Sequence, residues 1–441
     1  MEENKGGKLQ RDVEVMPLLQ DMPRTRRVPG PDRKPRTAAE TGVRESLLED
    51  LALKTLYLAG PFSVLELSDK TRLSFEVADQ LFSRLRGKML CEVTGMNRNV
   101  PNISITSQGR SRALELLAQS QYMGAAPVSL DAYVDQVRRQ SVKSVEVHQE
   151  HVEKAFAHMV VDPKTLAQYG TALNSGSAVF IYGPPGVGKT AAAETLSRVL
   201  ANDAVWIPYA LEVDGQVITV FDPALHKRKP MPEISKHDER WVLCDRPAVM
   251  VGGELTVDML DLQFNPVSRY YFGPVQMKAN NGVLIIDDFG RQRIPPEELL
   301  NRWVVPLDRR IEFLSLMGGR KIEIPFEMLV VFASNRDPAS LLDQAFLRRI
   351  HTKIKIGAAS KEQFCEIFRR VASERGMEAE QALLDELVII IQDSLKQELR
   401  PCYPRDLVDQ VCWAAKYEGR SPFLDRTALM RAVEAYFIPN A

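Results

Sequence analysis

The chain has 441 residues, of which 45% are hydrophobic and 26% charged, so it is long enough to bury large cores in several domains. Its 57 basic and 58 acidic side chains leave a net charge of −1, which excludes a global electrostatic preference for nucleic acid or anionic membranes. Five cysteines, odd in number and never spaced C-x-x-C, indicate neither a disulfide framework nor a zinc knuckle.

The sequence carries no sign of membrane insertion. No apolar run approaches the roughly 18 residues of a membrane-spanning helix, and the first residues lack the basic start and apolar stretch of a signal peptide. We therefore expect a cytoplasmic protein with reduced cysteines.

Residues 1–42 are poor in aromatic side chains and rich in proline, glycine and arginine. Such a segment buries too little apolar surface to offset the entropy of ordering, so we expect a disordered tail. Its basic side chains are Arg24, Arg26, Arg27, Arg33, Lys34 and Arg36. They could contact phosphates or acidic protein, or simply belong to a solvated linker.

Residues 43–122 carry amphipathic helical segments followed by two short β-prone segments. The helical segments are 47–58, 64–70 and 74–88, and the β-prone segments are 91–94 and 103–106. This order resembles a winged helix-turn-helix domain, a module that binds either DNA or protein. Residues 123–150 are expected to form a linker and a lead-in helix.

The sequence leaves open whether such a domain binds DNA or protein. Duplex binding would place cations of the third helix and of the wing near phosphates: Arg84, Arg86, Lys88 and Arg98. The same helix carries Glu76 and Asp79, which repel phosphate, so docking of a protein is an equal alternative.

A phosphate-binding loop follows the apolar run 178–182 and precedes a helix-forming run. Its glycines allow backbone N–H groups to turn inward around an anion, Lys189 can reach the β and γ oxygens, and Thr190 can offer its hydroxyl to Mg²⁺. The eight residues are Gly183, Pro184, Pro185, Gly186, Val187, Gly188, Lys189 and Thr190.

Two further apolar strands end in polar side chains that suit the same site. The first ends in Asp287, which would hold Mg²⁺ through water, and Asp288, which would polarise the attacking water. The second ends in Asn335, which can help to position that water. An arginine pair, Arg348 and Arg349, precedes another strand, and Arg405 opens a helix near the C-terminus.

The order of these motifs resembles that of the AAA+ ATPases. The resemblance implies an α/β fold, with a parallel sheet flanked by helices over 151–356 and an α-helical lid over 357–441. It implies ATP and Mg²⁺ as ligands and a ring, expected to be a hexamer. In that ring Arg348 or Arg349 would reach the neighbouring subunit's γ-phosphate, while Arg405 would contact nucleotide from the lid of its own subunit.

Position 288 departs from the family pattern, because most members have glutamate where this chain has Asp288. Its carboxylate is one methylene closer to the backbone, and a misplacement of about 1 Å can cost on the order of a hundredfold in rate. The replication-initiator and helicase-loader branches resemble this chain in having two aspartates here, so we expect hydrolysis, at a lowered rate.

Insertions distinguish the chain within that family. Residues 311–324 are predicted to form a hairpin around Gly318-Gly319, which resembles the pre-sensor-1 hairpin of MoxR-like ATPases. Residues 203–271 form a longer insertion with a second predicted hairpin at Asp214-Gly215 and a basic loop at 226–229. One hypothesis is that the hairpin tip contacts substrate in a pore, through Met317, Gly318, Gly319 and Arg320; a rim position is the alternative.

Three functional interpretations follow. The chain could couple ATP turnover to the remodelling of a protein client that docks on the winged domain. It could instead act on DNA, as a loader, transposition helper or regulator whose winged domain binds duplex. A nucleotide-dependent scaffold with little turnover is the third.

Overall fold

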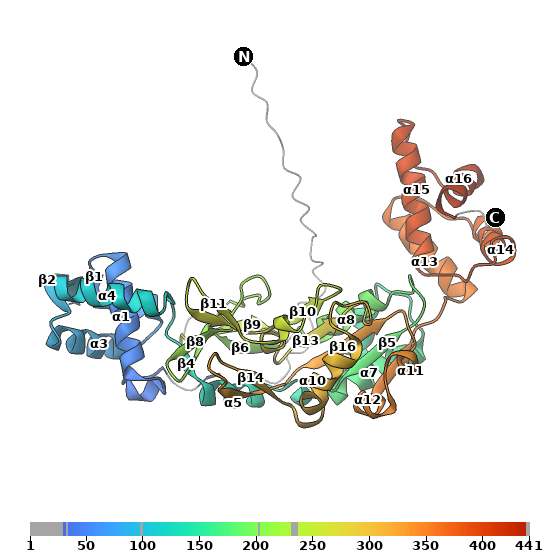
Figure 1. Cartoon of the computed structure of the whole chain (residues 1–441). Coiled ribbons are helices and arrows are strands. Elements are labelled where there is room, and N and C mark those ends of the chain that lie inside the picture. The colour runs from blue at the N-terminus through green and yellow to red at the C-terminus, as the bar shows by residue number, and fades with distance from the viewer. Residues whose placement is uncertain (1–29, 32–33, 98–99, 202, 231–236, 438–441) are drawn as a thin grey trace, which may run out of the picture.

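The computed structural model describes residues 30–31, 34–97, 100–201, 203–230 and 237–437. Figure 1 shows a helical body at one end (blue), a central body built around β-sheets, and a second helical body at the other end (red). Within the described residues, no helix is both long and apolar enough to cross a membrane.

The N-terminal body consists of helices around a small antiparallel sheet of order β1-β3-β2. Its elements are α1 (Glu45–Ala59), β1 (Phe62–Ser63), α2 (Val64–Thr71), α3 (Phe75–Gly87), β2 (Cys91–Asn97), β3 (Val100–Ile105) and α4 (Ser107–Gln119). Hydroxyl side chains start three of the helices: Ser63 closes a capping box with Glu66, Ser74 accepts from the N–H of Val77, and Thr106 caps α4.

The ordered chain begins earlier than the predicted tail boundary at residue 42. Ala38 is 1% exposed and belongs to the core of the N-terminal body, and the next residues form the 3₁₀ turn Ala39–Thr41. Lys34 pairs with Glu239 at 2.8 Å. The prediction from composition therefore placed the end of the tail too late, because Ala38 packs into a core formed by residues far away in the sequence. The predicted disorder of 1–29 and 32–33 lies outside the described residues.

The segment 123–150, predicted to be a linker and a lead-in helix, contains a helix as expected, and also a strand that belongs to a core. Its first strand joins a five-stranded sheet of order β11-β12-β8-β7-β4, and the following helix packs on that sheet. The elements are β4 (Val128–Ser129), α5 (Leu130–Arg139), β7 (Ala210–Val213), β8 (Gln216–Thr219), β11 (Gln263–Asn265) and β12 (Tyr270–Phe272). Strands β7 and β8 pair antiparallel across Asp214-Gly215, whose φ angles of 53° and 83° suit a tight turn.

The N-terminal body shares its core with this second sheet. Ala210 and Val217 are buried among its leucines, the N–H of Ala126 donates to Thr71 O at 2.7 Å, and the N–H of Gln121 donates to Ser268 O at 2.8 Å. Arg240 donates to the carbonyl oxygens of Thr41 and Pro127. The domain is therefore fixed to the sheet.

The central sheet is entirely parallel, with the order β10-β13-β16-β5-β17. Its strands are β5 (Val179–Tyr182), β10 (Ala248–Val251), β13 (Val283–Ile286), β16 (Leu329–Ser334) and β17 (Thr352–Lys355). Consecutive side chains face opposite sides: Val179 and Ile181 pack beneath one helix layer, and Phe180 packs beneath the other.

Helices cover both faces of this sheet. One layer contains α6 (Gln149–Phe156), α7 (Pro163–Ser175) and α8 (Lys189–Leu200), and the other contains α10 (Pro296–Arg309) and α12 (Gln344–Arg349). The predicted α/β class, a parallel sheet flanked by helices, is confirmed.

The remaining elements of the central body connect these layers. They are β6 (Ala204–Pro208) paired with β9 (Trp241–Asp245), the short helices α9 (Val275–Lys278) and α11 (Pro338–Leu341), and the antiparallel pair β14 (Ile311–Ser315) and β15 (Lys321–Pro325). The pair β14–β15 lies in the chain between the strands β13 and β16, after helix α10.

The C-terminal body is helical and has a core of its own. It contains α13 (Lys361–Glu374), α14 (Gln381–Ile389) followed by the π-helical turn Ile390–Ser394, α15 (Tyr403–Tyr417) and α16 (Arg426–Tyr436). Figure 1 shows it beside the central sheet, at the end opposite the N-terminal body.

Candidate nucleotide site

The loop between β5 and α8 has the backbone of an anion-binding turn. Gly186 and Gly188 have φ angles of 81° and 91°, which other residues rarely adopt. A Cβ at Gly183 would lie 1.9 Å from Ile356 O, so no larger residue fits there. The loop ends at the first turn of α8, where the helix dipole favours an anion. The core is an α/β phosphate-loop fold.

Lys189 folds back over this loop and donates to Pro184 O at 2.7 Å. Its burial lowers the pKa of the ammonium group, whereas the nearby carboxylates of Asp288 and Asp287 act in the opposite direction. The lysine thus lies between the loop and the carboxylates predicted to share its site.

Thr190 and Asp287 meet although 97 positions separate them in sequence. The Thr190 hydroxyl lies 2.9 and 3.1 Å from the two carboxylate oxygens of Asp287. These residues come from α8 and from the end of β13, and the N–H of Asp287 donates to Val251 O on the next strand. A hydroxyl and a carboxylate in contact match the pair of protein ligands expected for Mg²⁺.

Asp288 and Asn335 meet at the same edge, because β13 and β16 are neighbours in the sheet. Asn335 Nδ2 donates to Asp288 Oδ1 at 2.8 Å. Asp288 has a left-handed backbone with φ of 48°, a conformation that aspartate tolerates better than most residues. Four of the predicted residues, Thr190, Asp287, Asp288 and Asn335, are therefore brought together.

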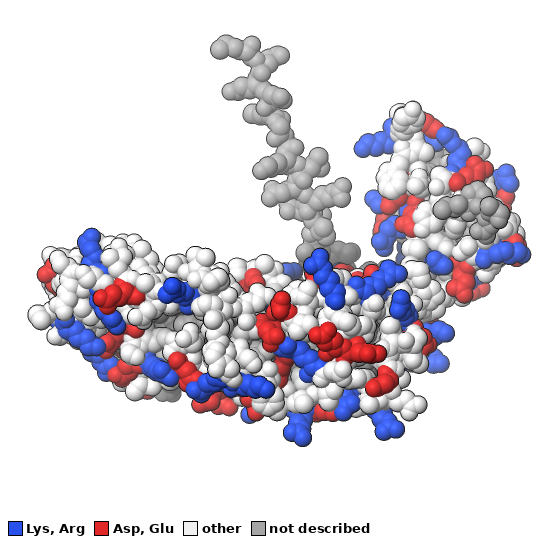
Figure 2. Space-filling model, viewed as in Figure 1, with Lys and Arg blue, Asp and Glu red and all other residues white. Residues whose placement is uncertain are grey.

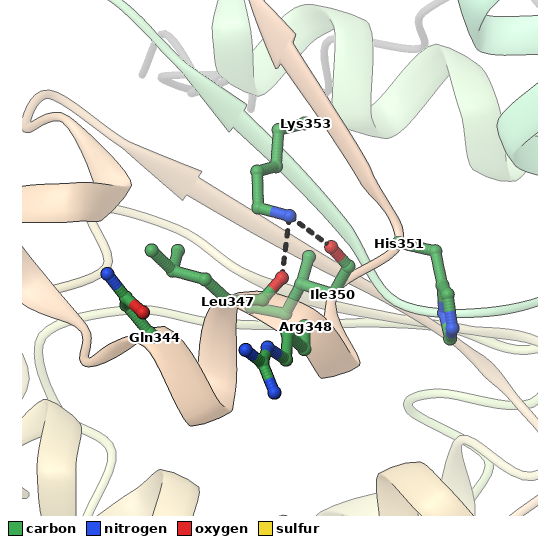
Figure 3. A pocket seen from close by; sticks show the side chains of 6 residues that line it. All are labelled: Gln344, Leu347, Arg348, Ile350, His351 and Lys353. Carbon is green, nitrogen blue, oxygen red and sulfur yellow. Dashed lines mark hydrogen bonds between the residues drawn. The ribbon is translucent and has the colours of Figure 1, made fainter.

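The two arginines at the end of α12 differ in their contacts. Arg349 pairs with Asp308 of α10 at 2.8 Å and lies over the ring of Phe346. Arg348 lines an open depression and makes no hydrogen bond or ion pair with any residue that the structure describes. In Figure 3 its guanidinium group points away from the Lys353 ammonium group, which donates to two backbone carbonyls of the same helix end.

Arg405 lies in the first turn of α15, and the start of this helix contacts the phosphate loop. The N–H of Cys402 donates to Gly186 O at 3.1 Å, and a Cβ at Gly186 would lie 2.5 Å from Cys402 Sγ. The Arg405 side chain is exposed, and no hydrogen bond to another described residue holds it. The helical body thus brings Arg405 to the neighbourhood of the loop without fixing its guanidinium group.

Sequence reasoning missed two residues that hold the loop carrying Asp288. Gln292 bonds to Asp287 O and to the N–H of Gly290, and Ser334 Oγ donates to Phe289 O. Ser334 directly precedes Asn335 and so lay within a motif already recognised. Gln292 follows an unremarkable loop sequence, and nothing in its spacing distinguishes it.

The tip of the hairpin β14–β15 is docked on the same chain. Arg320 pairs with Asp214, at the turn of the β7–β8 hairpin, and the N–H of Met317 donates to Tyr271 Oη at 2.9 Å. Asp214 also pairs with Arg44 of the N-terminal body at 3.3 Å. These partners hold the base of the tip, while the Met317 side chain stays exposed, so the hypothesis that the tip contacts substrate stays a prediction.

The basic loop 226–229 and the basic third helix are also engaged internally. His226 is 2% exposed and bonded at both ring nitrogens, Arg228 lies over the ring of Phe221 at 4.8 Å, and Lys229 pairs with Asp245. Arg84 of α3 pairs with Glu45 and Glu49, and Lys88, directly after this helix, pairs with Glu49. Arg98 lies outside the described residues. Figure 2 shows acidic and basic side chains interspersed over the visible face.

Comparison with known proteins gives partial matches. Residues 360–435 match a family model described as a domain of unknown function (DUF8689). A search of curated protein sequences finds no match to the chain.

Several solved structures are similar to the chain. The RuvB Holliday junction branch migration motor of Thermotoga maritima is 17% identical, with 70% of this chain and 71% of that chain covered and a TM-score of 0.36. NtrX of Brucella abortus, in complex with ADP, is 12% identical, with 75% and 67% covered and a TM-score of 0.39. Domain III of the replication initiation protein DnaA of Thermotoga maritima is 15% identical, with 64% and 97% covered and a TM-score of 0.35. Because these identities and TM-scores are low, we assign the fold from the chain's own strand order and contacts and not from these structures.

Proposed function

We propose that this chain is an AAA+ ATPase that binds ATP with Mg²⁺ and hydrolyses it to remodel a protein client. The observation that carries the proposal is the convergence of the Thr190–Asp287 and Asp288–Asn335 pairs at the edge of the sheet beside the phosphate loop. Phosphoryl transfer to water needs anion contacts, a cation ligand set and a carboxylate that orients the water, and these residue types supply all three.

Each side chain has a defined role in this proposal. The loop 183–190 cradles the phosphates, and Lys189 contacts the β and γ oxygens. Thr190 and, through water, Asp287 would hold Mg²⁺, which would neutralise charge on those oxygens. Asp288 accepts a proton from the attacking water, and Asn335 helps to orient it.

The site is completed by a second copy of the chain, in a ring that we take to be a hexamer. Arg348 is the residue that reaches the neighbour's γ-phosphate, since among the residues that the structure describes it has no partner, while Arg349 is bound to Asp308. Arg405 contacts the nucleotide from the C-terminal helical lid, whose first contact with the loop is the bond from Cys402 to Gly186.

The client is a protein rather than a DNA duplex. Pairing of Arg84 and Lys88 with carboxylates of α1 removes two of the cations that would face phosphates, which supports this assignment. The hairpin β14–β15, which lies in the chain between the two strands of the site, supports placement in the MoxR-like branch. We further propose that the N-terminal domain is a winged helix and that the protein is cytoplasmic. The alternative, action on DNA, is supported by Arg86, which stays exposed on α3.

Measurements of binding and turnover on the full chain test the proposal. We expect ATP binding and Mg²⁺-dependent phosphate release by the wild type, loss of binding in Lys189→Ala, and retained binding with only residual turnover in Asp288→Asn. Lys164→Ala, which removes an exposed lysine of α7, is the matched control and leaves both unchanged. A wild-type chain that neither binds ATP nor releases phosphate contradicts the proposal.

The client is tested with the same trap. A hydrolysis-blocked Asp288→Asn ring in the presence of ATP should retain a protein that the Lys189→Ala chain loses. Retention of nucleic acid, sensitive to nuclease, would instead support the DNA alternative.

A further inference from the structure

The loop after β13 reverses direction over Asp287–Gly290, and its second residue carries the carboxylate of the proposed site. Asp288 has φ of 48° and Gly290 has φ of 100°, so two of the four residues lie in the left-handed region. For residues other than glycine this region costs about 1 kcal/mol or more, and such conformations persist only where the surroundings enforce them.

Gln292 bonds across this reversal. Its Nε2 donates to Asp287 O at 2.7 Å, and its Oε1 accepts from the N–H of Gly290 at 2.8 Å. In an ordinary β-turn the carbonyl of the first residue and the N–H of the fourth would bond to each other. Here the Gln292 side-chain amide bonds to both groups and so bridges them in place of that direct bond.

The other side of the turn is fastened to β16. The N–H of Phe289 donates to Ala333 O at 2.7 Å, Ser334 Oγ donates to Phe289 O at 2.7 Å, and the buried Phe289 ring packs against Phe332. Phe289 is therefore held independently of Gln292. Two further hydrogen bonds act beside Gln292: the N–H of Arg291 donates to Asp288 O at 3.0 Å, and the N–H of Asp288 donates to Asp287 Oδ1 at 3.0 Å. Gln292 is the side chain that joins the Asp287 carbonyl to the Gly290 N–H.

We propose that Gln292 is a positioning residue: its amide wedges open the turn Asp287–Gly290 and thereby aims the Asp288 carboxylate. This inference rests on the proposed ATPase function. Without the amide, the freed Asp287 carbonyl and Gly290 N–H can bond to each other, and that closure rotates the peptide planes beside Asp288. The carboxylate then leaves its place beside Asn335.

Only an amide of this length meets both requirements. The wedge must donate to a carbonyl and accept from an N–H at once, which glutamate cannot do when ionised. A glutamate would also bring negative charge to a site that already has two carboxylates. Methionine matches glutamine in length and shape but offers neither bond, so Gln292→Met removes the hydrogen bonds with little change in packing.

Steady-state ATPase kinetics and nucleotide binding of the full-length Gln292→Met chain test this inference, with Gln292→Ala as a second variant. We expect kcat to fall on the order of tenfold to a hundredfold while KM and the Kd for ATP stay within about twofold, because the phosphate loop is untouched. Hydrogen exchange of the Gly290 amide should accelerate. Gln108→Ala, at an exposed glutamine of α4, is the matched control and leaves all four quantities unchanged.

A double-mutant comparison shows whether Gln292 acts through Asp288. In single-turnover measurements, Gln292→Met should have little further effect in an Asp288→Asn background, since the group that it positions is already disabled. An unchanged kcat in Gln292→Met, an equal loss with and without Asp288, or a parallel loss of ATP affinity each overturns the inference. Absence of turnover in the wild-type chain would instead overturn the proposed function, and Gly290 exchange would still report on the wedge.

Discussion

Asp288 stands where most AAA+ ATPases, which the sequence resembles, have glutamate, and its backbone angle favours aspartate. The shorter carboxylate predicts weaker reach to the attacking water, but its left-handed φ of 48° and its bond to Asn335 place it at the sheet edge. Aspartate is among the few residues that adopt this region readily, because its short side chain can bond locally. The residue type thus fits the turn.

We therefore expect Asp288→Glu to impair the chain, although glutamate is the commoner residue here in the AAA+ ATPases that the sequence resembles. The change should destabilise the fold by about 1 kcal/mol, because glutamate lacks the local bonding that favours aspartate in this conformation, and should lower turnover. Urea unfolding and phosphate release measure the two effects. Increased turnover with unchanged stability would show that the turn adapts to the longer side chain.

Glu312, at the base of the hairpin, provides a pH dependence. It is 3% exposed, and burial raises its pKa from 4.5 to about 7, although Arg302 pairs with it at 3.2 Å and acts in the opposite direction. An acid with a raised pKa holds its proton more tightly in the folded chain. Its contribution to the free energy of unfolding is therefore favourable at low pH and falls as the pH rises from about 4.5 to about 7.

Replacing Glu312 with glutamine removes this titration and should therefore change how Tm depends on pH. We expect the Tm of Glu312→Gln, relative to that of the wild type, to rise between pH 4.5 and pH 7 and then level off, whatever the constant offset of the substitution. Glu323→Gln, at an exposed position of the same hairpin, serves as control and should give a flat difference. A flat difference for Glu312→Gln would mean that the ion pair with Arg302 keeps this group at its ordinary pKa.

At the scale of elements, helix α3 has cations whose charge is already compensated. Arg84 and Lys88 are paired with Glu45 and Glu49 of α1, and the bond from Arg84 is the main reason that the pKa of Glu45 lies below its ordinary value. Periodicity predicts which face of α3 is buried. It says nothing of which carboxylates the adjacent helix presents to the cations.

We expect no binding of duplex DNA by the wild-type chain at physiological salt. The double variant Glu45→Gln/Glu49→Gln should bind at low salt, with log K falling against log salt more steeply by about two units, one for each freed cation. Fluorescence anisotropy at several salt concentrations gives the slope. Tight wild-type binding with a steep salt dependence would favour the DNA alternative.

The docked hairpin tip is the second element that depends on distant contacts. Arg320→Ala should accelerate hydrogen exchange of the Met317 amide, because the ion pair to Asp214 helps to hold the tip against Tyr271. Tm should change little, since an exposed ion pair contributes less than about 1 kcal/mol. Lys321→Ala, one residue further, is the control. Unchanged exchange would mean that the hydrogen bond from Met317 suffices alone.

At the scale of the whole molecule, the site is predicted to need two copies of the chain. Arg348→Ala and Asp288→Asn should each abolish most turnover, by about a thousandfold for a trans arginine. Mixing the two inactive chains should restore part of it, because one subunit then supplies Asp288 and its neighbour supplies Arg348. Arg349→Ala should have a smaller effect.

The mixing experiment can also contradict the assignment. If the mixture stays inactive, or if turnover per subunit of the wild type is independent of protein concentration, then Arg348 does not act across an interface. If Arg349→Ala complements Asp288→Asn while Arg348→Ala does not, then Arg349 and not Arg348 is the residue that acts across the interface.

The sequence by itself determined the α/β class and the residues of the phosphate loop, because apolar runs define buried strands and the loop's glycines and lysine act within eight consecutive residues. It also indicated Asp287, Asp288 and Asn335, since ends of parallel strands share an edge. Only the tertiary structure decided the rest: the different contacts of Arg348 and Arg349, the ion pairs of Arg84 and Lys88, the partners of the hairpin tip and the two hydrogen bonds of Gln292. Each depends on a partner supplied by another element or on a local backbone angle, and side-chain periodicity encodes neither.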